Sequence, residues 1–577
     1  MLLGKKRLNS PVVKGMMAVA LLSFFLGVFL EGSQELLTPR PISQVVTRGA
    51  GSVRTSGALE VPLITWGGDV ATIYALDSGL FKEEGLNVSL FLENNFVKQV
   101  EACLGGRTPY LRGTMGMINA ATEVFKKNGL NLVVICQLTW STGGDALVTR
   151  SHVKTPRGLK NKTIALQLYG PHMDYLANIL SRGNVPLKSV TLKWFRELTL
   201  PTYDPKGKIV DPVTAFLEDK SIDGVMCIIP DAMNLTSGGK VGTGAAGSVK
   251  GAKIMLSTKT ASRIIADVYA VRSDYFNNNK SKVQAFVKAL MKGQEKLQSL
   301  LSRRSENQSV YSKLMAHAAD LILGAPQATP EVEALLGDCE FVGYGGNVGF
   351  FTGRGTTRTL KNLTGEIQRS FIQMRLMNKT VSLNDPGWDF NAMAKGQIIT
   401  PKPEIPRQKF DVRKVEEKIS VEPTTWAEEG TLFQIEIGFE PNQSTFPEAR
   451  YANDFQKALE IAQTYGGSLI IIEGHSDPLG VLKAREKRKP AVEVRQMEQQ
   501  AKNLSLSRAS AVRESFLDYC KRKRFSIDES QFVAVGMGIA NPKYNPPRTK
   551  EEWIANRRVV FRIKQVEAEL TEFSPLK

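Results

Sequence analysis

The chain has 577 residues, of which 42% are hydrophobic and 23% charged, with 49 glycines and 27 prolines. This ordinary globular composition excludes wholesale disorder, a collagen-like repeat and a polytopic membrane protein. At about 100–200 residues per domain, the length predicts three or four domains. The net charge of +18 fits a nucleic acid, an anionic membrane or an acidic polymer as partner, and composition does not choose among them.

Histidine and cysteine are scarce, with four and five residues respectively. They are scattered and form no CxxC pair, so we expect no zinc cluster, and the odd number of cysteines argues against a disulfide framework. Four isolated histidines also do not provide a nucleophile–base pair or a metal set. We therefore expect no catalytic residues, no metal, no cofactor and no enzymatic activity.

The N-terminus predicts export. Residues 1–14 carry four basic side chains and no acidic one, and an apolar run from Met16 to Leu30 follows. This pattern is typical of a secretory signal or an uncleaved membrane anchor. No clear small-residue cleavage site follows, which favours a single-helix anchor over 1–31, with a cleaved signal peptide and a buried core helix as alternatives. The anchor predicts a single-pass inner-membrane protein with its bulk in the periplasm. Cleavage would leave it periplasmic, and in both cases nucleic acid is not an expected partner.

The first large unit alternates strands and helices. Residues 32–57 are polar, with proline and glycine, and predict a linker. After Leu59, apolar runs predict strands over 61–66, 87–92, 130–138, 146–150 and 161–168, and amphipathic stretches predict helices over 71–85 and 172–183. This alternation favours an α/β fold with a mostly parallel sheet. Helical patterns dominate from Ser281 to Leu323.

A second, smaller unit follows a linker predicted over 376–429, where several prolines and mixed charges occur. The unit extends over 430–567, with a tail over 568–577. Its predicted strands are 432–439, 468–477, 531–538 and 557–563, and its predicted helices are 449–467 and 505–524. This order indicates an α+β domain with helices on one face of a sheet.

Four segments of the first unit occur in a characteristic order, namely 79–91, 155–166, 215–233 and 273–293. In this order they resemble periplasmic solute-binding proteins of the nitrate, sulfonate, taurine and thiamine-precursor type. The resemblance implies a type II periplasmic-binding-protein-like module over 58–375. One lobe would combine 59–150 with 256–370, and the other would cover about 151–255.

A solute would then lie between the lobes, beyond the carboxyl ends of the strands. The candidate solute-binding residues at these strand ends are Trp66, Gly67, Thr114, Gly170, Pro171, His172, Pro230 and Asp231. The helix that begins after His172 would favour an anionic ligand group through its N-terminal N–H groups. Core packing for Trp66, an ordinary turn at Gly170 and a solvated helix start at His172 are the alternatives. Asp145 is a candidate ligand carboxylate or a strand-entry residue.

The second unit has three motifs in order: GHSD over 474–477, LSLSRA over 504–509 and NRRV over 556–559. Together they resemble the OmpA-type peptidoglycan-binding domain. The resemblance implies that Asp477 and Arg508 hold the diaminopimelate of the stem peptide, with Asn442 and Asn556 adding hydrogen bonds. A carboxylate suits the ammonium of that group and a guanidinium suits its carboxylate. Alternatively, Arg508 pairs with Asp477 only to tie helix to strand.

The spacing between the first two motifs is longer than the family's usual spacing, because a basic insertion occupies 480–503. It predicts a solvated helical protrusion, with attraction to an anionic wall polymer or another envelope partner as the alternative.

The expected function is a membrane-anchored, extracytoplasmic solute-binding protein that is tethered to peptidoglycan and feeds a transporter or senses a small solute, with anions among the candidates. One alternative is a motor-stator-like protein, which Met16–Leu30 disfavours because it contains no ionisable residue. The other is a structural scaffold between inner membrane and wall, whose lobes have lost their ligand.

Overall fold

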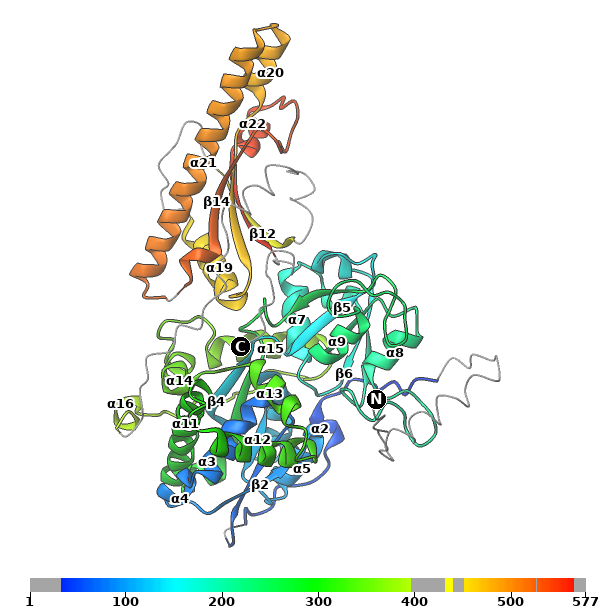
Figure 1. Ribbon diagram of the computed structural model, residues 1–577, viewed down its shortest axis with the longest axis vertical. Helices are drawn as coiled ribbons and strands as arrows, with labels where there is room; N and C mark the ends of the chain where they lie inside the picture. Colours follow the sequence, from blue (N-terminus) through cyan, green and yellow to red (C-terminus); the bar gives the residue numbers. More distant parts are fainter. Residues whose placement is uncertain (1–32, 55, 396–430, 439–450, 526, 565–577) are drawn as a thin grey trace, which may run out of the picture.

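The computed structural model describes residues 33–54, 56–395, 431–438, 451–525 and 527–564. The predicted anchor, most of the second predicted linker and Asn442 lie outside these ranges. Within them, no helix is both long and apolar enough to cross a membrane. The described chain forms two α/β lobes and a C-terminal domain with one long helix, α21 (Figure 1).

The first lobe is built on a four-stranded sheet in the order β11-β4-β10-β3. Its strands are β3 (Tyr110–Thr114), β4 (Leu132–Ser141), β10 (Ala266–Arg272) and β11 (Cys339–Phe341). A parallel pair, β1 (Leu59–Leu63) and β2 (Val88–Leu92), lies beside β3. Strand β10 runs antiparallel to both β3 and β4 because the chain re-enters this lobe from the other one. The prediction of a mostly parallel sheet is therefore wrong for this lobe, because all three strand pairs of its four-stranded sheet are antiparallel.

Helices cover this sheet, and aromatic rings fill the space beneath them. The helices are α3 (Val70–Asp77), α4 (Leu80–Glu83), α5 (Phe96–Leu104), α6 (Met115–Lys127), α10 (Ser273–Asn278), α11 (Lys280–Ser302), α12 (Gln308–Leu323), α13 (Thr329–Gly337), α14 (Gly343–Thr352), α15 (Leu360–Gln373) and α16 (Phe390–Met393). Phe286 of α11 stacks on Phe81 and Tyr110, with ring centroids 5.4 and 4.7 Å apart. The single helix predicted over 71–85 is two helices, because Gly79 has φ 77° and ends the first one.

The second lobe has a five-stranded sheet in the order β7-β6-β8-β5-β9. Its strands are β5 (Asp145–Thr149), β6 (Thr163–Gln167), β7 (Thr191–Phe195), β8 (Gly224–Ile228) and β9 (Lys253–Ser257). Its helices are α7 (Met173–Arg182), α8 (Pro212–Glu218) and α9 (Ile229–Leu235). Strand β6 is parallel to β7 and β8, whereas β5 is antiparallel to β8 and β9. This sheet is therefore mixed.

The segments predicted as linkers contribute to the folded lobes. Leu37 pairs with Trp194 at the edge of the second lobe, and helix α2 (Ile42–Val45) packs on α6 of the first. Past the predicted domain end at 375, Asn384 pairs with β4, and the indole of Trp388 donates to the Ile135 carbonyl at 2.9 Å. The first lobe therefore extends to α16.

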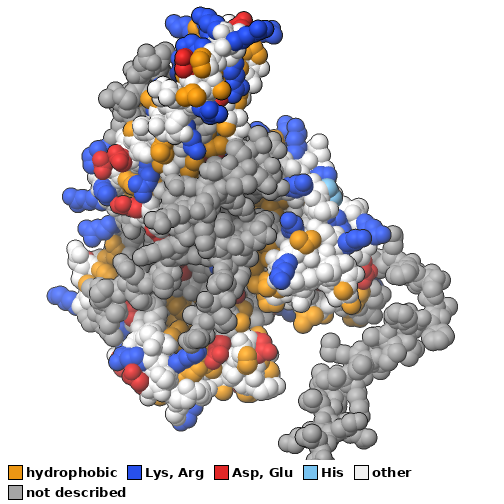
Figure 2. Space-filling model, turned by 45° about the horizontal axis from the view of Figure 1, so that its top comes forward, with side chains coloured by type: hydrophobic (Ala, Val, Ile, Leu, Met, Phe, Trp, Pro, Cys, Tyr) orange, Lys and Arg blue, Asp and Glu red, His pale blue; other side chains and the backbone are white. Residues whose placement is uncertain are grey.

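The C-terminal domain is an α+β unit with the sheet order β12-β15-β13-β14. Its elements are β12 (Thr431–Gly438), α19 (Ala452–Thr464), β13 (Leu469–His475), α20 (Leu479–Glu486), α21 (Ala491–Arg522), β14 (Phe532–Gly538), α22 (Lys550–Asn556) and β15 (Arg558–Lys564). The insertion over 480–503 forms α20 and the first part of α21, as its helical prediction indicates. These helices extend from the sheet as a hairpin, and Lys and Arg side chains gather at its tip (Figures 1 and 2).

The C-terminal domain docks on the lobes through the turn between α19 and β13. The Tyr465 hydroxyl, fully buried, donates to the Asn178 side chain of α7 at 2.9 Å. The Gly467 N–H donates to the Thr260 carbonyl at 3.2 Å. Residue Gln463 accepts from the Thr357 backbone N–H at 2.7 Å, just before α15. One turn thus contacts both lobes and the chain between them.

Candidate functional site

Two short chain crossings form the junction between the lobes, Thr142–Gly144 and Thr258–Ile265. Their ends are tied together by hydrogen bonds. The Ser141 hydroxyl donates to the Asp145 carboxylate at 2.6 Å and lies 2.9 Å from the Thr258 hydroxyl. The same Thr258 hydroxyl accepts from the Asp145 backbone N–H at 3.1 Å. Asp145 therefore lies at the centre of the junction.

His172, predicted from the start of α7, reaches this centre. Its Nε2 lies 2.8 Å from the Asp145 carboxylate, and the imidazole is completely buried. Its other nitrogen, Nδ1, has no hydrogen-bond partner. The alternative of a solvated helix start is thus wrong, because His172 is completely buried. Asp145 does more than begin a strand, because it binds both His172 of its own lobe and Ser141 at the end of β4.

The predicted residues of the first lobe are buried in packing contacts. The Trp66 indole donates to the Thr139 hydroxyl at 3.2 Å, and a Cβ at Gly144 would come within 2.6 Å of its ring. A Cβ at Gly67 would lie 2.2 Å from the Leu335 carbonyl, so this glycine permits a close approach to α13. The Thr114 hydroxyl caps α6 by accepting from the Met117 N–H at 3.2 Å.

The remaining predicted residues belong to the second lobe. Gly170 is buried against Gln167, whose side-chain oxygen would lie 2.1 Å from an added Cβ. Pro171 is half-buried at the start of α7, whereas Pro230 is exposed in the first turn of α9. Asp231 is half-buried, one of its oxygens has no hydrogen-bond partner, and burial with the nearby Asp211 charge raises its pKa to about 6. His172 lies close enough to oppose that rise.

Asp174 is a further polar residue of the junction, and the sequence interpretation missed it. The side chain is 4% exposed, and neither carboxylate oxygen has a hydrogen-bond partner. Burial raises the pKa of this carboxyl to about 7. The sequence feature that could have identified Asp174 is an acidic residue within the otherwise apolar start of the predicted helix 172–183. Its neighbours Met173, Tyr175 and Leu176 are all fully buried.

A second group of buried charges lies in the first lobe. Arg112 of β3 binds Asp69 at 2.8 Å and Asp267 of β10 at 3.0 Å, and all three side chains are almost completely buried. Burial raises the pKa of Asp69 to about 7 even though the guanidinium opposes it. Each of the three charged side chains has an ion-pair partner within the cluster. The cluster therefore links β3 and β10 to Asp69, which follows β1, and leaves none of these charges available to bind a solute.

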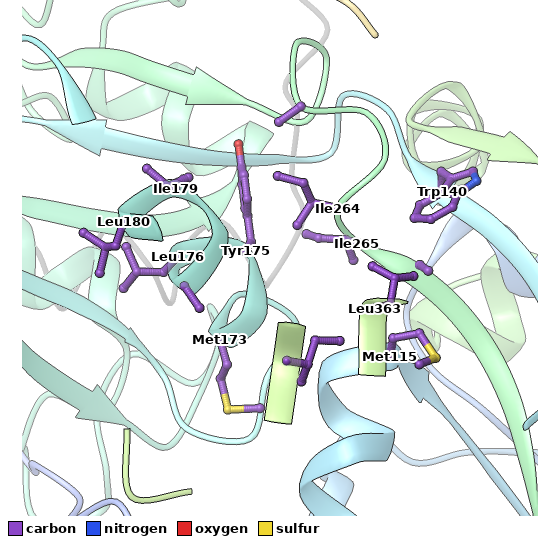
Figure 3. Packing of buried hydrophobic residues seen from close by; sticks show 14 of the residues in the cluster. Met115, Trp140, Met173, Tyr175, Leu176, Ile179, Leu180, Ile264, Ile265 and Leu363 are labelled. Atoms are coloured by element: carbon purple, nitrogen blue, oxygen red, sulfur yellow. The ribbon is translucent and has the colours of Figure 1, made fainter. Parts of the chain in front are cut away.

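Apolar side chains fill the space around these polar groups. Met115 begins α6 in one lobe, Met173 begins α7 in the other, and both are fully buried (Figure 3). Two cavities of about 330 and 270 Å³ lie instead on the first lobe around Arg54 and Arg107, and no predicted solute residue lines either. The junction is thus closed in this structure.

Three arginines occur in the C-terminal motifs, Arg508, Arg557 and Arg558, and the charge of Arg557 acts on Arg508. The Asp477 carboxylate accepts from the Leu479 N–H at 2.9 Å and forms no ion pair with Arg508, so the alternative of a structural pair is wrong. Arg508 is 3% exposed, and its Nε lacks a hydrogen-bond partner, as do buried guanidinium nitrogens of Arg557 and Arg558. Burial and the Arg557 charge lower the pKa of Arg508.

The Asn556 side chain, in contrast, forms its hydrogen bonds within the protein. It is fully buried, and its side-chain oxygen accepts from the backbone N–H groups of Lys543 and Tyr544 at 2.7 and 2.9 Å. Its amide donates to the Tyr544 carbonyl at 2.8 Å. The side chain holds the loop before α22.

Residues 69–299 match the family model described as NMT1/THI5 like, and this range lies within the two lobes. None of the curated proteins compared with the chain matches it.

Solved structures with similarity include two solute-binding proteins. The periplasmic aliphatic sulphonate binding protein SsuA from Escherichia coli is 15% identical, with 57% of this chain and 90% of that chain covered and a TM-score of 0.38. The periplasmic nitrate-binding protein NrtA from Synechocystis PCC 6803 is 11% identical, with 47% and 67% covered and a TM-score of 0.32.

A third similar structure is the peptidoglycan-associated lipoprotein from Burkholderia pseudomallei. It is 18% identical, with 22% of this chain and 89% of that chain covered and a TM-score of 0.17.

Proposed function

We propose that this chain is an extracytoplasmic solute-binding protein whose lobes close over a small molecule and whose C-terminal domain binds peptidoglycan. The observation that carries the first part is a set of buried polar atoms without partners where the lobes meet: Nδ1 of His172, both carboxylate oxygens of Asp174 and one of Asp231. Buried polar groups are nearly always hydrogen-bonded in folded proteins. A ligand at the junction would supply the missing partners.

The family match over 69–299 supports the same interpretation. Opening the two crossings would expose the junction, and closing them over a ligand is a hinge motion of the kind common in two-lobed binding proteins. The bound solute would pass to a transporter or signal to an envelope partner. The apolar run from Met16 to Leu30 supports a single-pass inner-membrane anchor, which would leave the lobes in the periplasm.

Native mass spectrometry of the gently purified full-length chain, followed by a thermal-shift screen of small metabolites, tests solute binding. We expect a retained adduct or a rise in the unfolding midpoint, since a ligand that binds only the folded state stabilises it by mass action. A chain with no adduct and no shift across the screen would contradict solute binding.

The guanidinium groups around Arg508 support the peptidoglycan part of the proposal. Their buried N–H groups without partners suit a carboxylate, which accepts strong charge-assisted hydrogen bonds from arginine. The nearby Asp477 would accept from the ammonium of diaminopimelate. Asn556 keeps only a positioning role, through the loop that it holds.

Sedimentation of the full-length chain with purified peptidoglycan sacculi tests these roles. We expect Asp477→Ala and Arg508→Ala to abolish co-sedimentation. Lys521→Ala is the matched control, because it removes an exposed positive charge from the same helix, α21, outside the basic insertion over 480–503, and should sediment like the wild type. Undiminished sedimentation of both site variants would exclude these residues from peptidoglycan binding.

A structural scaffold is the second candidate function. The burial of Met115 and Met173 at the junction favours it, because side chains that are fully covered by protein atoms present no surface to a solute in this closed form. The adduct and thermal-shift measurements distinguish the two candidates.

A further inference from the structure

Acidic side chains outnumber basic ones where the lobes meet. Asp145 interacts electrostatically with Asp174 of the second lobe and with Asp338 of the first. Asp231 interacts with His172, which is itself bound to Asp145. These carboxyl groups therefore form one group around the two chain crossings.

The basic groups nearby are already engaged with other partners. His172 binds Asp145. The Arg358 guanidinium is held by both oxygens of Glu366 at 3.0 Å and by a backbone carbonyl. Lys259 is exposed and interacts electrostatically with Asp338. Neither Asp174 nor Asp231 has a cationic side chain within ion-pair distance in the described part of the chain, so the junction keeps an excess of negative charge.

Asp174 also occupies a position that would suit an anionic ligand. A Cβ added at Gly116, the second residue of α6, would lie 2.4 Å from its Oδ1, so this second-lobe carboxylate presses against the start of a first-lobe helix. The N-terminus of a helix attracts anions through its unpaired N–H groups and dipole. With a fixed carboxylate already there, an incoming sulfonate or nitrate would meet like charge.

We infer that the junction takes an organic cation, a solute bearing an ammonium group, with the Asp174 carboxylate as its principal contact. This inference rests on the proposed solute-binding function and names the class of its ligand. Each ammonium N–H would supply a partner that the carboxylate oxygens of Asp174 lack, and the added positive charge would offset the acidic excess. The pKa of Asp174, raised to about 7 by burial, fits a carboxylate whose compensating charge is missing.

The cation is organic rather than metallic. Within the described ranges, no three histidine, cysteine, aspartate or glutamate side chains come together in a way that could hold a metal ion. The fully buried Met115 and Met173 on either side of the junction suit the carbon skeleton of an organic solute.

Titration calorimetry and thermal shift with defined probes test the inference on the full-length chain. The cationic probes are choline, 1,4-diaminobutane and spermidine, and the anionic probes are ethanesulfonate and nitrate. We expect at least one cation to bind and to raise the unfolding midpoint, and neither anion to do so. Asp174→Asn keeps the shape of the side chain and removes its charge, and it should weaken cation binding by at least about tenfold.

Asp320→Asn is the matched control, because it neutralises an exposed aspartate on α12, and it should bind the cation as the wild type does. Binding of ethanesulfonate or nitrate, or cation binding unchanged by Asp174→Asn, would overturn the inference and leave solute binding intact.

If no probe binds but the chain retains an adduct, the class of that molecule decides: a cation supports the inference, and an anion or neutral molecule overturns it. If nothing binds and nothing is retained, the proposed function itself fails.

Discussion

At the scale of single residues, Arg112 and Asp174 are both buried and ionisable, but among the described residues only Arg112 has ion-pair partners. Arg112 is completely buried but bound by two carboxylates, whereas Asp174 is almost as buried and bound by no side chain. An ion removed from water is tolerated when hydrogen-bonded partners replace its hydration, and it is costly when they do not. Arg112 therefore stabilises the first lobe, whereas the charged form of Asp174 destabilises the second.

Asp174→Asn should make the protein more stable, and increasingly so as the pH rises. The pKa of this carboxyl is raised from 3.8 to about 7 in the folded state, so between these values the folded chain binds a proton that the unfolded chain has released. Wild-type stability therefore falls as the pH rises through that window, and asparagine removes the loss. We expect a gain on the order of 2–4 kcal/mol at pH 7 and almost none near pH 4. Urea unfolding across this range measures it, and a pH-independent difference would contradict the buried, unpaired state of Asp174.

Arg112→Met should strongly destabilise the first lobe. The methionine would leave Asp69 and Asp267 buried without their cation, and loss of one partner from a buried ion pair costs about 3–5 kcal/mol. Arg107→Met is the control, because Arg107 binds Glu60 at 2.9 Å on the surface, where such pairs contribute about 1 kcal/mol or less. Urea unfolding of both variants provides the comparison. Similar losses would mean that burial of the Arg112 pairs has no special weight.

At the scale of elements, the packing of α21 on the C-terminal sheet depends on glycine. A Cβ at Gly474 of β13 would lie 1.9 Å from the Ser505 carbonyl, and one at Gly536 of β14 would lie 2.6 Å from the Lys502 carbonyl. Backbone atoms cannot swing aside as a side chain can. The Ser505 hydroxyl, held against the strands in this way, accepts from the Gly538 N–H at 2.9 Å. This close approach positions Arg508, one turn further along the helix.

Gly474→Ala should therefore separate α21 from the sheet. We expect a loss of about 1–3 kcal/mol or more from overpacking, together with weaker sedimentation with sacculi because Arg508 moves. Gly480→Ala is the control, since its Cβ would meet only the Met497 methyl at the ordinary distance of 3.7 Å and alanine favours helix α20. A Gly474→Ala variant as stable as Gly480→Ala would contradict the close packing.

Individual helices and strands also show how much of the fold could be predicted from the sequence. Strands such as 146–150 and 161–168 could be predicted because apolar runs bounded by turn residues are local patterns. Strand direction could not, since β10 becomes antiparallel only because the chain returns from the second lobe. Among the predicted site residues, His172 reaches the junction, and Asp145 was a sequence candidate too, but only the folded geometry shows that the two bind each other. The missed Asp174 was likewise hidden in an apolar helix.

At the scale of the whole molecule, the C-terminal domain docks on the region where the two lobes meet. Its turn touches α7 through Tyr465, the second chain crossing through Gly467 and the segment before α15 through Gln463. A buried apolar cluster continues through the same region from the lobes into this domain, as Tyr175, Ile264 and Leu363 show for the lobe side (Figure 3). A hinge motion between the lobes would therefore strain these contacts, so we expect the C-terminal domain and the two lobes to be mechanically coupled.

Gly467→Ala should undock the C-terminal domain without damaging its core. The added Cβ would lie 2.0 Å from the Lys259 carbonyl, which belongs to the second crossing and cannot retreat without moving the hinge. We expect a larger radius of gyration by small-angle X-ray scattering and two separate thermal transitions in place of one. The neighbouring Gly466→Ala is the control, because its Cβ would meet only the tip of the Ser262 side chain at 3.1 Å, and this tip can rotate away. If Gly467→Ala keeps the wild-type radius and a single transition, the contact between the domains does not hold them together. If it undocks, any change in the affinity of the variant for a solute that the wild type binds measures how strongly the C-terminal domain and the junction between the lobes are linked.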